Sequence, residues 1–209
     1  MIAVALGVVA GIATVAVVSL VLYRHLTPPS PGSASAEQAA SEMLPQDTSE
    51  RDALFAEIER LGFQAVRNEI FAEEFELAEL GGDARALSAF SGQLVLLNFW
   101  ATWCPPCVEE MPSLQNLHDA LEEDAFSVVA VNVQEDDATV EEFVHRLELE
   151  FPVLLDRNGT TTRRYAVRGL PTSYLIGPDG RVLAAKAGFH LWDQPGFADG
   201  FRRILELSS

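Results

Sequence analysis

The sequence predicts an α/β domain in which helices cover a mainly parallel β-sheet. Two strand-length apolar runs, residues 94–100 and 126–133, are joined by residues 108–121, in which apolar side chains recur every three to four positions. This order is typical of a right-handed βαβ unit, and the near-continuous apolar strands indicate burial on both faces of a sheet. Two cysteines, Cys104 and Cys107, stand where the first strand gives way to the helix.

The start of the chain is predicted to be a membrane anchor. Residues 2–23 carry no charge and are dominated by Ala, Val, Ile, Leu and Gly. At about 1.5 Å per residue, a helix of this length spans a hydrocarbon layer of ~30 Å. The run is longer than the usual core of a signal peptide, which favours a retained anchor, while the small residues at 34–36 keep cleavage as the alternative. Residues 1–25 are therefore assigned to a transmembrane anchor.

Two appendages are expected between the anchor and the globular domain. Residues 26–50 are rich in Pro, Ser and Ala with few large apolar side chains, a composition that indicates a flexible tether. Within residues 51–69, Leu54, Ile58 and Leu61 follow capping side chains at helical spacing, which predicts a short amphipathic helix. This helix could dock on the domain, and the plainer interpretation is a structured linker; no function is assigned to it.

The globular domain is predicted over residues 70–207. Alternation at residues 75–80, a turn at 81–83 and a short run at 85–87 predict a β-hairpin ahead of the central strand. After the second buried strand, the expected elements are a helix at 139–149, a strand at 151–155, a helical turn at 160–165, strands at 173–176 and 181–185 around the turn 177–180, and a helix at 197–207.

The cysteine spacing predicts a reactive dithiol. Cys104 is expected near the N-cap of the helix and Cys107 in its first turn, which places the two sulfurs within bonding reach. The positive end of the helix dipole favours a thiolate at Cys104 and lowers its pKa. Pro105 and Pro106 lack N–H groups, so the first amides able to face this sulfur belong to Cys107 and Val108. The interpretation is a pair that cycles between dithiol and disulfide.

Two plainer interpretations of the cysteines stay open, a static disulfide and half of a zinc site. Four-ligand zinc sites need further Cys or His residues at suitable spacing. The chain has two cysteines in all, and its four histidines are scattered at His25, His118, His145 and His190. We therefore expect no metal and no cofactor.

Residues 98–112, which read Asn-Phe-Trp-Ala-Thr-Trp-Cys-Pro-Pro-Cys-Val-Glu-Glu-Met-Pro, resemble the active-site segment of the thioredoxin-like TlpA/ResA group of membrane-anchored thiol–disulfide oxidoreductases. Residues 169–172, Gly-Leu-Pro-Thr, resemble the second landmark of this family. The resemblance covers roughly residues 70–207. It implies a thioredoxin-like fold with an N-terminal β-hairpin and a central helix–strand insertion, preceded by one transmembrane helix.

The resemblance also implies how a substrate docks. The family has a cis-proline at the position of Pro171, beside the cysteines, and the backbone of Leu170 would then pair with an incoming peptide. Proline before a strand is also common without any function. Trp103 is expected on the rim that a substrate meets, together with Pro105 and Pro106.

The third implied site residue is Glu110, three residues after Cys107, because the family keeps a functional glutamate there. Many thioredoxins instead use a buried aspartate at the position of Asn98. A partly buried Glu110 with a raised pKa would accept or return the Cys107 proton during exchange. The alternative is a surface carboxylate that complements the helix dipole, as expected for its neighbour Glu109.

The function implied is reduction of disulfides in specific protein partners outside the cytoplasm, by a single-pass inner-membrane protein with its domain on the periplasmic side. The family's usual targets are the haem-binding cysteines of apocytochrome c or a copper-carrying protein of oxidase assembly, and a membrane thiol donor would re-reduce the protein. Arg24, on the C-terminal side of the apolar run at residues 2–23, opposes this orientation by the positive-inside rule. The alternatives are a copper- or haem-handling chaperone and a general dithiol oxidase.

Charge excludes two classes of partner. The formal net charge of −17 argues against nucleic acid and against docking on anionic lipid. The acidic clusters at residues 122–124, 135–137 and 141–142 are interpreted as solvated surface.

Overall fold

The computed structural model describes residues 48–208. Its strands are β1 Gln64–Ala65, β2 Glu76–Glu79, β3 Ala84–Ala86, β4 Leu94–Trp100, β5 Phe126–Val133, β6 Val153–Asp156, β7 Thr172–Ile176 and β8 Val182–Ala187. Its helices are residues 48–60, the 3-10 helix η1 Leu87–Phe90, α3 Pro105–Ala120, α4 Asp137–Arg146, α5 Thr160–Arg164 and α6 Phe197–Ser208. The two buried strands have the predicted bounds, and the insertion of α4 and β6 follows β5 as expected.

The described strands form one eight-stranded sheet in the order β1-β8-β7-β4-β5-β6-β2-β3. The neighbours β4, β5 and β6 are parallel, whereas the other neighbouring pairs are antiparallel. The expectation of a mainly parallel sheet is therefore wrong for the sheet as a whole. It holds for the three central strands, which helices connect, while tight turns such as residues 177–180 join antiparallel neighbours.

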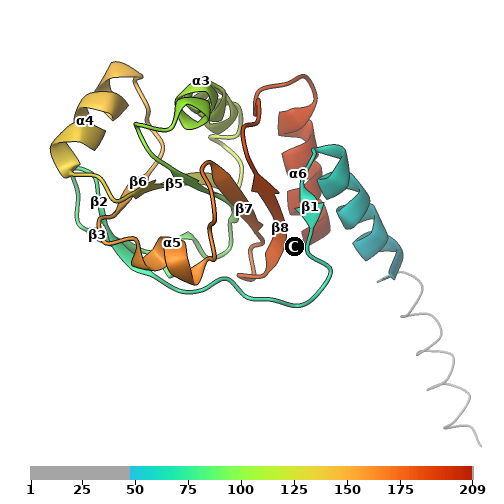
Figure 1. Ribbon diagram of the computed structural model, residues 1–209. Coiled ribbons are helices and arrows are strands. Elements are labelled where there is room, and N and C mark those ends of the chain that lie inside the picture. Colours follow the sequence, from blue (N-terminus) through green and yellow to red (C-terminus); the bar gives the residue numbers. More distant parts are fainter. Residues whose placement is uncertain (1–47, 209) are drawn as a thin grey trace, which may run out of the picture. The chain divides into compact units, whose positions relative to one another are not determined.

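Alternation along β4 divides the core between the two faces of the sheet (Figure 1). Leu96 and Trp100 pack with α3, α4, α6 and the helix 48–60, while Leu97 and Phe99 pack on the face covered by η1 and α5. Because side chains in a strand alternate, Asn98 shares the face of Leu96 and Trp100. A polar side chain is thereby placed in the apolar layer beneath α3.

The segment 48–65, most of which falls in the predicted helical linker at residues 51–69, is part of the packed domain. Its buried apolar residues belong to the same cluster as α3 and α6, namely Leu54, Phe55, Ile58, Leu61 and Phe63. β1 adds to the edge of the sheet by pairing with β8. A Cβ atom on Gly200 of α6 would lie 2.8 Å from a methyl carbon of Leu61, so the two helices approach closely. The compact unit therefore begins at Ser49, earlier than the predicted boundary at residue 70.

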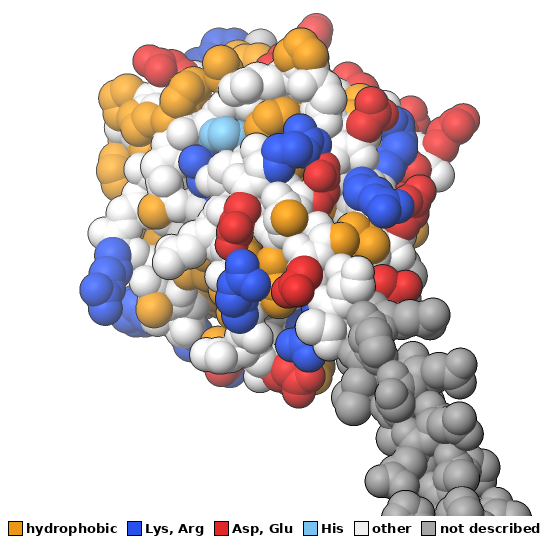
Figure 2. Space-filling view, turned by 90° about the vertical axis from the view of Figure 1, so that its right-hand side faces the viewer, with side chains coloured by type: hydrophobic (Ala, Val, Ile, Leu, Met, Phe, Trp, Pro, Cys, Tyr) orange, Lys and Arg blue, Asp and Glu red, His pale blue; other side chains and the backbone are white. Residues whose placement is uncertain are grey.

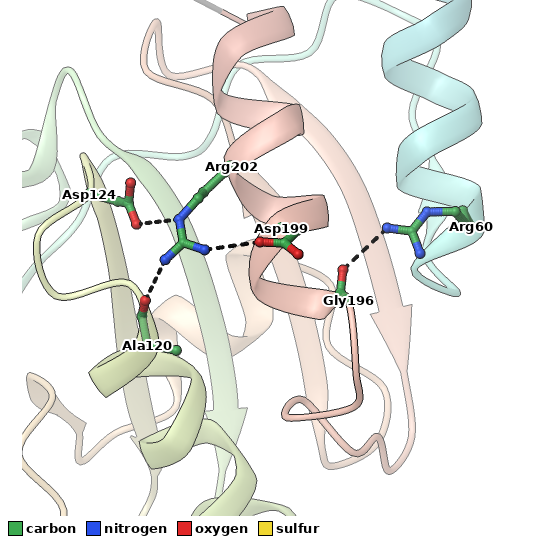
Figure 3. Close-up of polar contacts among 6 residues, drawn as sticks. All are labelled: Arg60, Ala120, Asp124, Gly196, Asp199 and Arg202. Carbon is green, nitrogen blue, oxygen red and sulfur yellow. Dashed lines mark hydrogen bonds and ion pairs between the residues drawn. The ribbon is translucent and has the colours of Figure 1, made fainter.

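Arg202 of α6, and Arg60, which contacts Gly196 just before α6, link this helix to neighbouring elements (Figure 3). Arg202 donates at 3.0, 3.1 and 2.7 Å to the carboxylates of Asp124 and Asp199 and to the carbonyl of Ala120. Arg60, on the helix 48–60, donates to the carbonyl of Gly196 at 3.4 Å. Such exposed contacts contribute only about 0.2–1 kcal/mol each, so the apolar packing beneath them dominates the stability of this contact.

Acidic and basic side chains are interspersed on the face that carries the helix 48–60 (Figure 2). Two of the ion pairs, Arg67 with Glu59 and Arg203 with Glu206, join residues of the helix 48–60 and α6 to near neighbours in the sequence. On this face the negative charge of the chain is therefore not gathered into one area.

The predicted anchor, and the tether up to residue 47, lie outside the described residues. Within residues 48–208, no helix has both the length and the apolar character needed to cross a membrane.

Candidate active site

The two cysteines lie at the junction of β4 and α3 and form a disulfide. After β4, Ala101 to Cys104 make a turn closed by a 3.2 Å hydrogen bond from the Cys104 N–H to the Ala101 carbonyl. Cys104 is the N-cap residue of α3, and the Cα atoms of Cys104 and Cys107 are 5.3 Å apart. Cys104 retains 4% of its surface, whereas Cys107 is fully buried. Cys104 is therefore the cysteine that an incoming sulfur meets first.

The first turn of α3 has ordinary helical geometry. Pro105 and Pro106 occupy its first two positions, where a missing N–H costs nothing. The Val108 N–H donates to the Cys104 carbonyl at 3.1 Å, so it makes an ordinary helical bond. The Cys104 side chain makes no capping hydrogen bond, and the helix is regular from its N-cap onward.

The predicted rim residues come from two loops at the same end of the sheet. Trp103 is 65% exposed, Pro105 is exposed and Pro106 is half-buried. The Leu170–Pro171 peptide bond is cis, as the resemblance implied. Thr172, the next residue, pairs with Phe99, which places Leu170 and Pro171 beside the end of β4 where the cysteine turn begins. The structure thus brings the two sequence landmarks together.

Glu110 is fully buried on the sheet side of α3, one turn after Cys107. Asn98 Nδ2 donates to its Oε1 at 2.7 Å, and the His190 backbone N–H donates to its Oε2 at 3.1 Å. Burial raises the pKa of Glu110 to about 7, although these hydrogen bonds favour the ionised form and oppose the shift. Glu109 is exposed, so the helix separates the two glutamates. Glu110 is a buried acid whose charge changes near neutral pH.

The segment after β8, residues 188–193, contacts Glu110. It lies along α3 and contacts Glu110, Ser113 and Asn116, which are spaced three positions apart on that helix. The His190 N–H bonds Glu110, the Trp192 N–H donates to the Ser113 hydroxyl at 3.1 Å, and Asn116 donates to the Asp193 carboxylate at 2.8 Å. Trp192 is fully buried.

The His190 side chain joins this segment to the N-terminal part of the domain. Its ring lies 4.8 Å from that of Trp192, and Phe63 contacts Trp192 with a centroid distance of 5.6 Å. Burial, followed by the nearby Lys186 ammonium, lowers the pKa of His190, while a contact with the Leu61 backbone opposes the shift. The lowered pKa favours the neutral imidazole.

Sequence reasoning missed three contributors to the site. Asn98 was noted only for the aspartate that it replaces, although an amide in an otherwise apolar strand signals a buried partner. The segment 188–193 carries no motif, and its contacts with α3 join residues about 80 positions apart. Glu135 was assigned to solvated surface, yet its carboxylate accepts a 2.7 Å hydrogen bond from the Thr102 backbone N–H in the cysteine turn.

Across residues 48–208, no group of three or more His, Cys, Asp or Glu side chains is placed to hold a metal ion.

Comparison with known proteins places this site in a family. The AhpC/TSA family model matches residues 70–185, more than half of the chain. The chain belongs to the AhpC/TSA family. Within the family, ResA of Halalkalibacterium halodurans, a thiol–disulfide oxidoreductase, is 37% identical over 129 residues, which are 62% of this chain and 69% of that protein. ResA of Bacillus thuringiensis is 40% identical over 112 residues, 54% of this chain, and the match spans 65% of its length.

Solved structures show the same fold. A thiol:disulfide interchange protein DsbE from Chlorobium tepidum matches with a TM-score of 0.61 and 32% identity, over 68% of this chain and 99% of that one. StoA from Bacillus subtilis matches with a TM-score of 0.53 and 28% identity, over 70% of this chain and all of that one. The thioredoxin-like fold and the resemblance to thiol–disulfide oxidoreductases of the ResA type are thereby confirmed.

Proposed function

We propose that this chain is a thiol–disulfide oxidoreductase that reduces disulfides in protein partners. The observation that carries the proposal is the difference in burial between the two cysteines. Cys104 reaches the surface at a helix N-terminus, while Cys107 is buried one turn from the buried acid Glu110. An outer nucleophile, an inner resolving thiol and a proton acceptor are the groups that thiol–disulfide exchange needs.

Exchange proceeds in two displacements. In the reduced protein, the Cys104 thiolate attacks one sulfur of the partner disulfide, and the other partner sulfur leaves as a thiolate and takes a proton from water. Cys107 then loses its proton and attacks Cys104, which displaces the first partner sulfur as a second thiolate, and this thiolate takes up the second proton. The partner gains two electrons and two protons, and the protein is left with the Cys104–Cys107 disulfide seen in the structure.

Glu110 is the proposed acceptor for the Cys107 proton. It lies on the same side of α3, because residues three apart on a helix are neighbours. A carboxyl group with a pKa of about 7 both accepts and returns a proton near neutral pH. Exclusion of water by Trp192 and by the segment 188–193 leaves few other acceptors for this proton.

The partner is proposed to dock across the rim. Trp103 and the two prolines offer apolar surface on one side of Cys104, and the backbone of Leu170 before cis-Pro171 offers hydrogen-bonding groups on the other. The half-buried Leu170 contacts both apolar clusters, so its backbone is held in place. The partner would lie as an extended peptide between these two groups of residues, with its disulfide at Cys104.

The cellular setting is proposed from the sequence and the family. Residues 2–23 would anchor the chain in the inner membrane with the domain on the periplasmic side. The partners would be the haem-binding cysteines of apocytochrome c or a copper-assembly protein. Because such a compartment is oxidising, a membrane thiol donor would have to return two electrons to the Cys104–Cys107 disulfide.

The reduction potential of the full-length protein tests the direction of electron flow. We expect equilibration with thiol–disulfide buffers near about −270 mV, as for thioredoxin, whereas a value near about −120 mV would identify an oxidase. Cys107→Ser and Cys104→Ser are a matched pair. The first should accumulate a mixed disulfide with a protein substrate such as insulin, and the second should not. Trapping through Cys107 in the second variant would contradict the assigned roles.

A further inference from the structure

We propose that Glu135 is a positioning residue that holds the turn carrying Trp103 and Cys104, and so sets the reactivity of Cys104. The inference rests on the proposed function for its meaning. Glu135 would act on Cys104 through the backbone of the turn and not by direct contact with the sulfurs.

The contacts of Glu135 converge on one end of this turn. Its Oε2 accepts a 2.7 Å hydrogen bond from the Thr102 backbone N–H, and its Oε1 accepts from the Thr102 hydroxyl. Oε2 also accepts from Asn132 Nδ2 at 2.7 Å. Three donors therefore fix one carboxylate, and two of them belong to Thr102, the first central residue of the turn between Ala101 and Cys104.

Glu135 is itself held rigidly relative to the sheet. Asn132, which is buried, pairs with Trp100 in the parallel ladder of β4 and β5. Thr102 and Glu135 therefore follow two residues that lie side by side in the sheet. Gln134 then adopts a φ of 58°, and its N–H donates to the Asp156 carbonyl at 3.1 Å. This left-handed residue ends β5 and turns the chain so that Glu135 reaches across to Thr102.

The turn between Ala101 and Cys104 needs such support because the strand pairing of β4 ends before the turn begins. β4 ends at Trp100, and α3 begins at Pro105 with two residues that have no N–H group. Trp103 is largely exposed and gives the turn little packing. The Glu135 carboxylate therefore supplies anchoring where the local sequence does not, and charge-assisted hydrogen bonds are the strong ones. Cys104 is thereby kept at the N-cap, where the helix end favours its thiolate.

The test compares Glu135→Ala with Glu135→Gln in the full-length protein. Both variants lose the same charge, so a difference between them reports the hydrogen bonds. The Gln carbonyl can take the two donors of Oε2, and its NH₂ can donate to the Thr102 hydroxyl, which turns to accept. Ala leaves these donors without a partner.

Two readouts are compared, with Asp136→Ala as the control. The first is kcat/KM for reduction of insulin, and the second is the pH profile of Cys104 alkylation by iodoacetamide in a Cys107→Ser background. Asp136 caps α4 by accepting from the Thr139 N–H at 3.0 Å, so its loss should lower the unfolding midpoint without changing the thiol.

We expect Glu135→Ala to reduce insulin about tenfold more slowly than Glu135→Gln, since small misplacements of reacting groups have effects of this size. Its alkylation midpoint should lie at higher pH than that of the Gln variant. Identical behaviour of the Ala and Gln variants would overturn the proposal. If the Cys104–Cys107 pair of the wild type did not interconvert with thiol–disulfide buffers, the proposed function would fail, while the alkylation profiles would still decide the role of Glu135.

Discussion

Asn98 on the central strand β4 donates a 2.7 Å hydrogen bond to the carboxylate of Glu110 on α3. The same Asn98 Nδ2 donates to the Ser173 hydroxyl on β7 at 3.0 Å, so the amide is held between the sheet and the helix. Because residue 98 carries an amide and not a carboxyl group, the Glu110 carboxylate has no second carboxylate as its partner in this contact. The ionisable group behind the disulfide is therefore carried by the helix and not by the strand.

Asn98→Asp would place two carboxyl groups within hydrogen-bonding distance in the core. They would share a proton, and the second ionisation of the pair would shift well above pH 7 because like charges repel at low dielectric. We expect the free energy of unfolding to fall by about 1–3 kcal/mol at pH 8 and much less at pH 5. Urea unfolding at the two pH values measures this. An equal loss at both would show that packing, and not charge, is responsible.

The pKa of Glu110 predicts a pH dependence of stability. Because the folded pKa of about 7 lies above the ordinary 4.5, the folded protein retains a proton that the unfolded chain loses between these values. Stability should therefore fall as the pH rises from about 4.5 to 7, by roughly 3 kcal/mol at 1.4 kcal/mol per pKa unit. Glu110→Gln should remove this component. Urea unfolding of the oxidised proteins from pH 4 to 9 measures it, and parallel curves would contradict the burial argument.

The same variant tests the proton role. If Glu110 accepts the Cys107 proton, Glu110→Gln should slow release of the partner from the mixed disulfide, and most strongly near pH 7. Glu109→Gln, one position away and exposed, is the matched control and should behave as the wild type. An unchanged pH profile of thiol reactivity in Glu110→Gln would rule out the role.

How far the sequence predicts this architecture depends on how local the cause is. The strands at residues 94–100 and 126–133 appear with their predicted bounds because burial on both faces leaves a continuous apolar run. Cys104 is found at the N-cap for an equally local reason, since prolines are favoured in the first turn of a helix, where their missing N–H groups would have no helical partner.

The acidic run at residues 135–137 shows where such reasoning ends. Three consecutive carboxylates with the same composition have three different contacts. Glu135 binds the cysteine turn, Asp136 caps α4, and Asp137 pairs with Arg157 at 2.6 Å. Their surroundings come from chain segments that are remote in the sequence or from turn geometry. Periodicity therefore identifies the strand before them and not their separate roles.

Gly200 marks the close contact between α6 and the helix 48–60. A Cβ atom there would lie 2.6 Å from Arg60 Nη2 and 2.8 Å from a methyl of the buried Leu61. Ala is favoured over Gly within a helix by about 1 kcal/mol, but overpacking costs about 1–3 kcal/mol. We expect Gly200→Ala to be destabilising on balance in urea unfolding. Gly169→Ala, where a Cβ would meet nothing within 4 Å, should lack the packing cost.

The segment 48–65 should be needed for the stability of the domain. A chain that begins at residue 70, as sequence reasoning would place the boundary, lacks the five apolar side chains that this segment buries. Each contributes about 1.5–3 kcal/mol of burial, which is partly offset by the ordering of their backbone, against a typical total stability of about 5–15 kcal/mol. We expect a chain starting at residue 70 to unfold at lower urea concentration than one starting at residue 48, and to bind a dye for exposed apolar surface.

This truncation also connects the segment to the active site. Phe63 packs on Trp192, whose backbone lies over α3 beside the carboxylate of Glu110. Without Phe63, the segment 188–193 loses part of its support, water reaches Glu110, and its pKa should move from about 7 toward 4.5. The pH dependence of stability described above should then flatten, as in Glu110→Gln. A shorter chain that retained both its stability and that pH dependence would show that residues 48–65 rest on the domain without supporting the site.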